Sequence, residues 1–334
     1  MVSSPVTSHP DELLEGDLPA GSVIGAYRIE STVGAGGMGF VYRATHALTH
    51  RTAAIKVMRE DQLVQDRAVD RMMREASILA SVSHPGIPQF FECGILDDGR
   101  PWIAMELIAG APLAHRMQRE LIPATDVIEF VQGVAGVLAA AHGRGVTHRD
   151  LKPDNIFLTP DCERCRVRVI DWGIAHAVAG SRFTNMNEAI GTPTYMAPEQ
   201  ARGGPTDGFC DVYGLGIVAY QALTGRPPFL GSTSVEILVQ HLNRPVPALA
   251  PRCPDAPYGL VELVERMLAK NFDERPSASE VAHELTRLQM RTSARQAAQQ
   301  PPLDRTDGIP LVTVEEVTAT TASIRAPHRS NAAD

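Results

Sequence analysis

One stretch of sequence limits what this chain can be more than any other. Residues 148–155 read His-Arg-Asp-Leu-Lys-Pro-Asp-Asn, and an Asp-Trp-Gly motif begins at Asp171, sixteen residues after Asn155. The stretch supplies a carboxylate from Asp150, an ammonium group from Lys152 and an amide oxygen from Asn155, and Asp171 adds a second carboxylate. Carboxylate and amide oxygens are hard ligands of the kind that Mg²⁺ prefers. The combination is typical of phosphoryl transfer.

Three further motifs surround this stretch. Lys56 lies in the Ala-Ile-Lys-Val sequence of residues 54–57, and an Ala-Pro-Glu sequence ends at Glu199. A glycine-rich run precedes both and consists of Gly34, Ala35, Gly36, Gly37, Met38 and Gly39. This order resembles the signature set of protein kinases, most closely that of the eukaryotic-like (Hanks-type) serine/threonine kinases of bacteria. The resemblance covers roughly residues 27–289.

The resemblance implies an α+β, two-lobed protein-kinase fold. An antiparallel β-sheet with one helix would form the N-lobe (27–108), and a mainly helical C-lobe would follow (109–289). Residues 1–26 contain Pro, Ser and acidic residues without periodicity, so we expect a flexible N-terminal segment. After residue 289 the chain has no aromatic residue and cannot bury enough apolar surface to become ordered. We therefore expect a disordered C-terminal tail over 290–334.

Periodicity supports this organisation. Apolar residues recur at three- and four-residue intervals over residues 67–80, which predicts a helix with one buried face. Glu75 lies beside that face, three residues after Met72 and four before Leu79, so its carboxylate can turn toward the sheet. Further helices are expected at 126–142, 212–224, 262–269 and 279–290, and strands at 27–33, 40–44, 52–58 and 101–107.

A Gly-x-Gly-x-x-Gly run alone is weak, because dinucleotide-binding folds use it as well. In those folds the glycines open a helix, and an acidic residue follows about twenty positions later. Here residues 40–43 continue as a strand, and the residue twenty positions after Gly36 is Lys56. A nicotinamide-dependent oxidoreductase is therefore disfavoured. By resemblance, the run Gly34 to Gly39 would hold the phosphates of ATP.

The resemblance also implies roles for the polar residues. Lys56 would bind the α- and β-phosphates and be held by Glu75. Asp150 would accept or orient the proton of the substrate hydroxyl, and Lys152 would steady the γ-phosphate. Asn155 and Asp171 would bind Mg²⁺, with Mn²⁺ as an alternative. The positions that match the adenine site are the apolar wall and the hinge, namely Val41, Ala54, Phe157, Glu106 and Leu107.

Specificity and regulation follow from the same comparison. Lys152, two positions after Asp150, is typical of the serine/threonine class, and Thr192 would contact both residues on the substrate side. The segment before Glu199 contains polar hydroxyl residues, and a phosphate there could be clamped by a guanidinium group. We expect activation by autophosphorylation at Thr184, with Ser181 as the second site.

Trp172 departs from the pattern, because the family usually has Phe between this Asp and Gly. A larger aromatic ring must then pack under the helix at 67–80, near Leu79. This departure motivates the alternative of a pseudokinase that binds nucleotide and acts as a scaffold. His148 is expected to be structural, and Glu199 with Arg275 matches an ion pair of the family's C-lobe.

Composition limits the partners and the compartment. A formal charge of −8 and a pI near 5.8 argue against nucleic-acid binding. Five cysteines are an odd number in a chain of this length, which indicates a reducing compartment and hence the cytoplasm. No signal peptide or membrane span is expected. The expected partners are ATP and protein substrates, with transient self-association during autophosphorylation.

Cys162 and Cys165 form a Cys-x-x-Cys sequence that invites a zinc or redox interpretation. A structural zinc site needs four ligands, and no second pair occurs at a suitable spacing. The position between the apolar segments 156–158 and 167–170 favours a hairpin connection.

Overall fold

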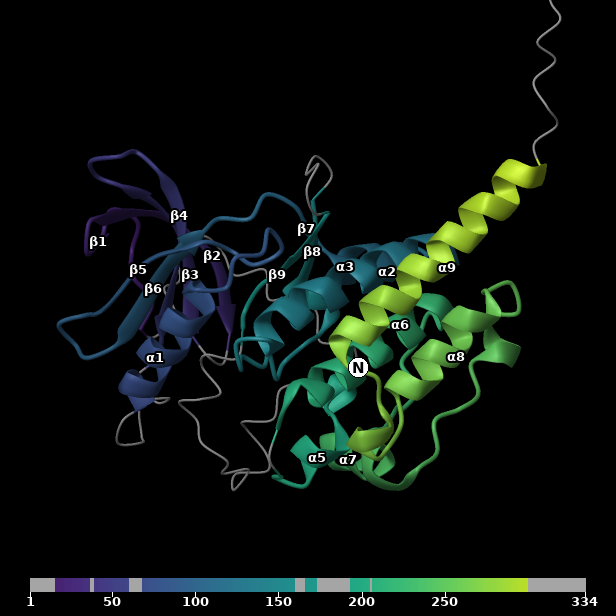
Figure 1. The fold of residues 1–334 in the computed structure, drawn as a ribbon. Helices are drawn as coiled ribbons and strands as arrows, with labels where there is room; N and C mark the ends of the chain where they lie inside the picture. Colours follow the sequence, from purple (N-terminus) through teal and green to yellow (C-terminus); the bar gives the residue numbers. More distant parts are fainter. Residues whose placement is uncertain are drawn as a thin grey trace, which may run out of the picture. The chain divides into compact units, whose positions relative to one another are not determined.

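The computed structural model describes residues 16–36, 39–59, 68–159, 166–172, 193–204 and 206–299. The chain divides into two units, residues 1–291 and residues 292–334. In the first unit, a six-stranded antiparallel sheet and a group of helices form separate lobes, which confirms the predicted fold class (Figure 1). Of the second unit, the described part is the end of helix α9.

The sheet of the N-lobe places different residues on its two faces. Because side chains alternate along a strand, Phe40, Tyr42, Ile55 and Val57 share one face and are almost fully buried. The strand order is β1-β2-β3-β4-β6-β5, and all pairs are antiparallel. The strands are β1 (Val23–Ile24), β2 (Tyr27–Gly36), β3 (Gly39–His46), β4 (Thr52–Met58), β5 (Phe90–Ile95) and β6 (Pro101–Glu106). The four predicted strands all form.

The expectation of a flexible N-terminal segment is wrong for residues 16–26. Strand β1 pairs with β2, and Ile24 is 1% exposed within the N-lobe core. The hydroxyl of Tyr42 donates to Asp17 Oδ1 over 2.8 Å and accepts from the backbone N–H of Leu18 over 3.0 Å. The buried face of the sheet needs a cover, and this segment provides it. Residues 1–15 lie outside the described residues.

Helix α1 (Ala68–Ala80) lies against the sheet, next to β5 (Figure 1). It matches the helix predicted over 67–80. Its buried face includes Ala76 and Leu79, which are 4% and 0% exposed. The apolar period therefore identified the correct face.

The C-lobe is organised around the helix α6 (Gly208–Thr224), which contacts both α3 (Ala124–His142) and α8 (Tyr258–Met267). Helix α6 is buried on nearly every side, as its apolar composition predicted. Among the described residues, α3 has the length and apolar composition of a membrane-crossing helix. Its side chains Val131, Val134 and Leu138 are fully buried, however, so α3 serves as an interior helix of this lobe.

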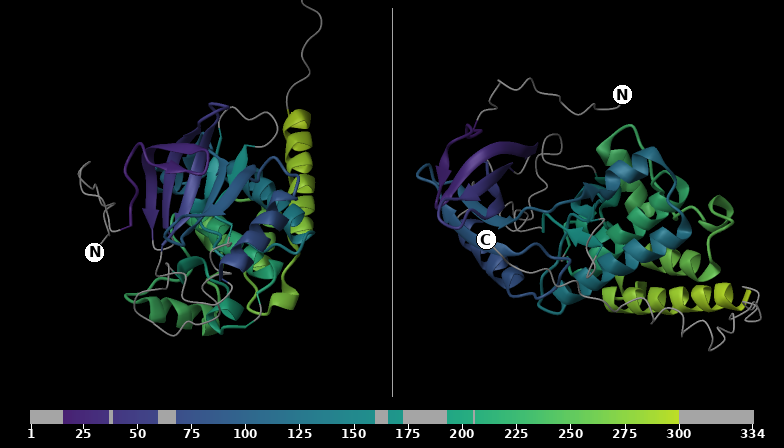
Figure 2. Two further views of the ribbon diagram at one scale, coloured as in Figure 1. Left: turned by 90° about the vertical axis from the view of Figure 1, so that its left-hand side faces the viewer. Right: turned by 90° about the horizontal axis from the view of Figure 1, so that it is seen from above.

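Shorter elements complete the C-lobe, and Figure 2 shows its helices from two further directions. A three-stranded sheet is formed by β7 (Ala111–Pro112), just after the predicted boundary between the lobes, with β8 (Ile156–Leu158) and β9 (Val167–Val169). The antiparallel pairing of β8 with β9 agrees with a hairpin, although Cys162 and Cys165 lie outside the described residues. The remaining elements are α2 (Leu113–Arg119), η2 (Pro153–Asn155), η4 (Pro193–Tyr195), α5 (Pro198–Ala201), α7 (Ser234–Asn243), η5 (Ala250–Arg252) and η6 (Phe272–Glu274).

The predicted start of the disordered tail is also wrong. Helix α9 runs from Ala278 to Gln299, nine residues past the end of the helix expected over 279–290. Its sequence beyond that point is rich in Ala, Arg and Gln, which are good helix formers. The tail was judged by its lack of apolar surface, which does not prevent an existing helix from continuing. Residues 300–334 lie outside the described residues.

Candidate active site

The loop after α3 brings three of the predicted residues together. Lys152 Nζ lies 2.8 Å from Asp150 Oδ2, and Asn155 Nδ2 donates to the backbone carbonyl of Asp150 over 2.8 Å. Helix η2 begins with Pro153, whose fixed φ suits a first helical position, and carries Asn155 back toward Asp150. The side chains of Asp150 and Lys152 are 30% and 32% exposed, so a substrate can reach them.

A residue that the sequence analysis missed holds this loop in place. Asp211 on α6 is 1% exposed, and its carboxylate accepts the backbone N–H groups of His148 and Arg149 over 2.7 and 2.8 Å. Its Oδ2 also lies 2.8 Å from His142 Nε2. The carbonyl of Arg149 accepts from Gln200 Nε2 over 2.8 Å. A lone aspartate at the start of an apolar helix was the signal available in the sequence, because a buried carboxylate needs partners.

Arg149 and Asp171 adopt left-handed backbone angles, with φ of 66° and 54°. This conformation costs a non-glycine residue about 1–3 kcal/mol and persists only where the surroundings enforce it. The Asp211 carboxylate supplies that enforcement at Arg149. Such angles gather at functional sites, which agrees with the placement of Arg149 directly before Asp150 and of Asp171 against Lys56.

Lys56 and Asp171 meet across 115 positions of sequence. Lys56 Nζ, on the central strand β4, lies 2.9 Å from Asp171 Oδ1, just after β9. The Lys56 side chain is 14% exposed and that of Asp171 is 39% exposed. Although protein atoms surround the Asp171 carboxylate, water reaches it and screens the pair.

The charge of Asp171 is favoured by its neighbours. Burial alone would raise its pKa, but the charge of Lys56 and the hydrogen bond from that residue act against burial, with smaller help from His148 and Lys152. The net effect holds the pKa of Asp171 below its usual range. The carboxylate is therefore ionised at neutral pH, as a metal ligand must be.

The strand register puts the nucleotide-site candidates on one face of the sheet. Val41 on β3 is opposite Lys56 on β4, and Ala54, two residues before Lys56, is opposite Met105 on β6. Val41, Ala54, Lys56 and Met105 therefore share the face turned away from the N-lobe core. Met105 was not among the predicted residues, because only the register brings it opposite Ala54.

The glycines of the run from Gly34 to Gly39 are required for different reasons. A Cβ at Gly39 would lie 2.0 Å from the carbonyl oxygen of Val57, and the φ of Gly39 is +149°, so the packing of the sheet itself requires glycine. A Cβ at Gly34 or Gly36 would meet no atom of the described residues within 4 Å. The space above these two positions is open, which suits close approach of a phosphate to the backbone. Ala35 lies between them on β2, and Gly37 and Met38 lie outside the described residues.

The predicted hinge is held by an ion pair. Glu106 ends β6, accepts the backbone N–H of Gln89 over 3.1 Å and pairs with Arg168 on β9. Burial would raise the pKa of Glu106, but the bond from Arg168 outweighs burial and keeps that pKa low. Leu107 follows directly, and Phe157 lies on β8, next to Arg168 in the register of the small sheet.

The donor set fits a divalent metal only in part. The described residues contain no cluster of three or more His, Cys, Asp or Glu side chains. Mg²⁺, however, commonly takes one or two carboxylates and completes its shell with phosphate oxygens and water. Asn155 uses its amide nitrogen on Asp150, and its amide oxygen accepts no hydrogen bond within the described part of the chain. That oxygen and the ionised Asp171 are the two groups available for such an ion.

Trp172 is accommodated without displacing Asp171. Its ring is 4% exposed, belongs to the same buried cluster as Leu79, and donates through Nε1 to the carbonyl of Val169 over 2.9 Å. The ring of His148 packs 5.0 Å away, and His148 Nε2 bonds the carbonyl of Ile170 over 2.9 Å. The ring is therefore buried as expected, its packing against Leu79 stays a prediction, and His148 makes structural contacts.

Other predicted residues cannot be placed. Glu75 lies on α1, but its side chain is outside what the structure describes, so its pairing with Lys56 stays a prediction. Thr184, Ser181 and Thr192 lie outside the described residues.

The ion pair predicted in the C-lobe is confirmed. Arg275 binds both carboxylate oxygens of Glu199 over 2.6 and 2.9 Å, and the two side chains are 0% and 10% exposed. Arg275 also donates to the carbonyls of Ala269 and Phe209 over 2.8 and 3.0 Å. A buried guanidinium group with this many acceptors anchors α5 to the rest of the lobe.

Known proteins resemble this chain in sequence. The family profile of the protein kinase domain matches residues 27–285. The chain is 38% identical to the serine/threonine-protein kinase pkn3 of Myxococcus xanthus, over 76% of this chain and 48% of that protein. It is also 38% identical to the serine/threonine-protein kinase PkaA of Streptomyces coelicolor, over 80% of this chain and 50% of that protein. The chain thus spans about half the length of these relatives.

A solved structure agrees with the fold. The crystal structure of the PknI kinase domain of Mycobacterium tuberculosis is similar with a TM-score of 0.65 and 29% sequence identity, over 81% of this chain and 99% of that one. The family profile covers well over half of the chain, and Lys56 and Asp171, from separate motifs, meet in an ion pair. We conclude that the chain belongs to the protein kinase family and is related to the bacterial serine/threonine kinases.

Proposed function

We propose that this chain is a serine/threonine protein kinase that transfers the γ-phosphate of Mg·ATP to hydroxyl groups of proteins. The observation that supports the proposal is two polar pairs formed by motif residues. Lys56 on β4 pairs with Asp171 after β9, and Asp150 pairs with Lys152 on the loop that also holds Asn155. The charge of Lys152 acts on Asp171, so the two pairs lie near each other. The family uses a nucleoside triphosphate and a divalent metal in general; Mg²⁺ is our specific choice.

Each group has a defined task in this proposal. Lys56 binds the α- and β-phosphates, and the open backbone at Gly34 and Gly36 lets the phosphates approach. Asn155 and Asp171 would hold the Mg²⁺, which would neutralise charge on the phosphate oxygens. Val41 and Ala54 with Phe157 enclose the adenine, and Glu106 and Leu107 offer backbone groups at the hinge.

Asp150 orients the acceptor hydroxyl and takes its proton as the oxygen attacks the γ-phosphorus. The bond from the γ-phosphorus to the bridging oxygen breaks, and ADP leaves with that oxygen. Lys152 stays beside Asp150 and steadies the transferred phosphoryl group. Positioning supplies most of the catalysis, since orientation is worth about 7–11 kcal/mol. Lys152 at this spacing supports Ser and Thr as acceptors.

Regulation and location are proposals of the same kind. We expect autophosphorylation in trans at Thr184 and then Ser181, with Thr192 contacting Asp150 and Lys152. Intact mass analysis after incubation with ATP checks the sites, and modification at neither contradicts this part. The described cysteines Cys93, Cys210 and Cys253 are free thiols, which supports a cytoplasmic location.

The direct test is transfer of label from γ-labelled ATP to a generic basic protein. Asp150→Asn removes the proton acceptor, so the rate should fall about 10²- to 10⁴-fold, while nucleotide binding stays within about twofold of the parent. An inactive parent protein with intact nucleotide binding would favour the scaffold alternative. The placement of Trp172 removes the original reason for that alternative, because Asp171 keeps its contact with Lys56.

A further inference from the structure

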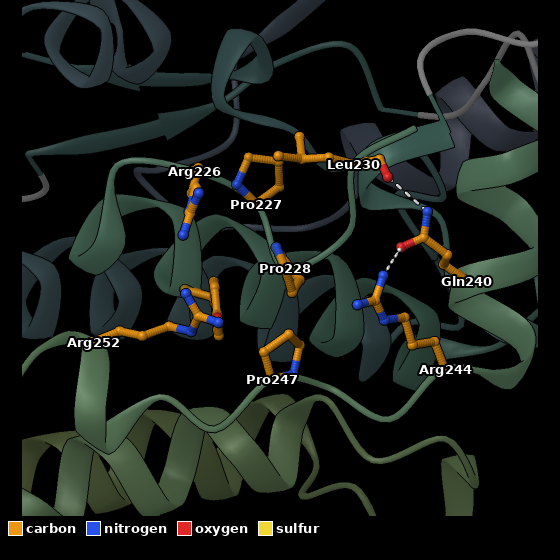
Figure 3. A pocket seen from close by; sticks show the side chains of 9 residues that line it. Arg226, Pro227, Pro228, Leu230, Gln240, Arg244, Pro247 and Arg252 are labelled. Carbon is orange, nitrogen blue, oxygen red and sulfur yellow. Dashed lines mark hydrogen bonds between the residues drawn. The ribbon is translucent and has the colours of Figure 1, made fainter. Parts of the chain in front are cut away.

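A polar pocket with three arginines lies in the C-lobe. It is formed by the end of α6, the loop that follows, helix α7 and the segment around η5 (Figure 3). Its volume is about 190 Å³. This is more than a bare ion needs and less than the ~300 Å³ at which sites for nucleotide-sized ligands begin. The lining residues are Tyr220, Arg226, Pro227, Pro228, Leu230, Gln240, Arg244, Pro247 and Arg252.

The pocket is positively charged. Arg226 and Arg252 lie on one side and Arg244 on the other, with Pro228 and Pro247 between them (Figure 3). Among the described residues, none of the three arginines forms an ion pair with a carboxylate, whereas Arg275 and Arg168 in the same lobe do. Like charges facing one cavity repel each other. An anion in the pocket would relieve that repulsion.

The guanidinium groups are held at the pocket by neutral neighbours. Arg244 donates to Gln240 Oε1 over 3.0 Å, and Gln240 Nε2 donates to the carbonyl of Leu230 over 2.6 Å, which joins α7 to the loop (Figure 3). Tyr220 is 2% exposed, and burial raises the pKa of its phenol while the nearby charges of Arg252 and Arg226 act against that rise. Both arginines therefore lie close to the same buried ring.

The walls leave the arginines as the principal donors. Pro227, Pro228 and Pro247 have no backbone N–H, and their rings restrict the backbone. Guanidinium groups recognise phosphate and carboxylate through paired N–H donors. Three of them around a small space match a dianion better than a single carboxylate, because a phosphorylated hydroxyl carries about −1.5 to −2 charges.

Helix α7 connects this pocket to the segment that receives substrate in the proposed function. It packs on η4 and α5, and η4 begins at Pro193, directly after Thr192. The next residue after the pocket-lining Gln240, His241, is buried and bonds the hydroxyl of Tyr213 over 2.9 Å. A protein bound at the pocket would thus lie on the same lobe as the catalytic loop.

Exposed aliphatic side chains occur on the loop and the helix that line the pocket. Leu230 lines the pocket and is 57% exposed. Val235 and Val239 share a face of α7 and are 46% and 50% exposed, and Val239 directly precedes the pocket-lining Gln240. Such side chains suit apolar residues next to an anionic one. A free ion would not need them, but a peptide would use them.

We propose that this pocket binds a phosphoserine or phosphothreonine of a protein segment, with the arginines on the phosphate and the aliphatic flank on the adjoining residues. Resting on the proposed kinase activity, the inference identifies proteins that are already phosphorylated as a preferred substrate class. Binding itself does not require catalysis, so it can be tested separately.

The binding test uses the full chain carrying Asp150→Asn and fluorescence anisotropy of labelled peptides. The probes are a hexapeptide with one phosphothreonine followed by leucine, its unphosphorylated form, and a form with glutamate at that position. The phosphorylated peptide should bind at least about tenfold more tightly than the other two, since hydrogen bonds to charged groups are each worth a factor of this size. Equal binding of all three overturns the proposal.

Variants locate the site. Arg244→Gln should weaken binding of the phosphorylated peptide about tenfold. The double variant Arg226→Gln, Arg252→Gln should weaken it further. Arg244→Lys keeps the charge but loses the paired donors, so its affinity should fall between those of Arg244→Gln and the parent. Arg287→Gln changes an exposed arginine of α9 that pairs with no carboxylate among the described residues, and this variant should bind as the parent does. Unchanged binding in Arg244→Gln, or loss in Arg287→Gln, contradicts the assignment.

Two further measurements separate the outcomes. Inorganic phosphate should displace the phosphorylated peptide. If the phosphorylated peptide binds no more tightly than inorganic phosphate, the pocket is a bare anion site and the docking proposal is overturned. With the active protein, a peptide carrying phosphothreonine beside an acceptor serine should have a several-fold lower KM than its unphosphorylated form, and Arg244→Gln should remove this difference. Activity on the unphosphorylated form should stay unchanged in Arg244→Gln, which distinguishes a failed docking site from a failed kinase.

Discussion

The two lobes build their parts of the site in different ways. In the C-lobe, the catalytic loop rests on buried polar groups, with Asp211 at 1% exposure accepting from two backbone N–H groups. In the N-lobe, Lys56 and its neighbours are placed by strand register, and the one described ion pair that crosses to Asp171 is open to water. Buried hydrogen bonds hold the loop of Asp150 in the C-lobe. Apolar packing on the opposite face of the sheet holds Lys56 and its neighbours in the N-lobe.

This difference separates stability from activity. Removing a buried acceptor in the C-lobe leaves donors without water or partner, which costs folding free energy. Removing a group on the open face of the sheet leaves a space that solvent fills. Damage to the C-lobe network should therefore lower both stability and activity, and damage to the N-lobe face should lower activity alone.

The largest effect is expected for Asp211→Ala. The change leaves the N–H groups of His148 and Arg149 buried and unpaired, so the free energy of unfolding should fall by about 3–5 kcal/mol and activity should be lost. Chemical denaturation and the label-transfer assay measure the two. Asp255→Ala, at an exposed position, is the control. A change in unfolding free energy below about 1 kcal/mol would break the comparison on its C-lobe side.

Lys56→Met tests the N-lobe side. The value of kcat/KM should fall about 10²- to 10³-fold, because a phosphate-directed charge is lost, while the unfolding free energy changes by no more than about 1 kcal/mol, since the pair is partly exposed. Arg28→Met on the exposed side of β2 should leave both unchanged. Strong destabilisation by Lys56→Met would show that the crossing pair supports the fold after all.

Two glycines sharpen the comparison within the N-lobe. Gly39→Ala should destabilise the fold by about 1–3 kcal/mol, because the new Cβ would meet the carbonyl of Val57 in a strained backbone. Gly36→Ala faces open space and should change stability by less than about 1 kcal/mol, yet raise the KM for ATP several-fold. Thermal unfolding and ATP kinetics of the matched pair check this. The reverse pattern would contradict the role of Gly36 in phosphate binding.

The smallest effect is a pH dependence in the C-lobe. Burial, helped by the charge of Lys270, lowers the pKa of His241 to about 4. In the unfolded chain His241 is protonated below about pH 6.5, whereas in the folded chain it stays neutral down to about pH 4. The contribution of neutral His241 to stability is therefore fully present above pH 6.5 and is lost as the pH falls toward 4. Between pH 7 and pH 5.5 the loss should be about 1 kcal/mol. His241→Gln keeps an acceptor for Tyr213 and should lack this part of the pH dependence in unfolding experiments; an unchanged slope would argue against it.

Much of the architecture could be predicted because it depends on short-range patterns. The apolar segment over 52–58, bounded by polar connections, and the three- and four-residue period over 67–80 reflect which side chains are buried, and both elements form as expected. The motif spacing likewise identified Lys56 and Asp171. The two wrong boundaries, at residues 16–26 and 290–299, arose where local composition was taken as sufficient and neighbouring structure decided the outcome.

The sequence by itself determined the family, the order of the elements and the residue types needed for phosphoryl transfer, because these follow from motifs and periods along the chain. Only the tertiary structure decided that Asp211 supports the catalytic loop, that Met105 faces the same side as Ala54, and that Arg226, Arg244 and Arg252 share one pocket. These are contacts between residues far apart in the chain. No local pattern in the sequence encodes these contacts, since they depend on how separate helices, strands and loops pack against one another.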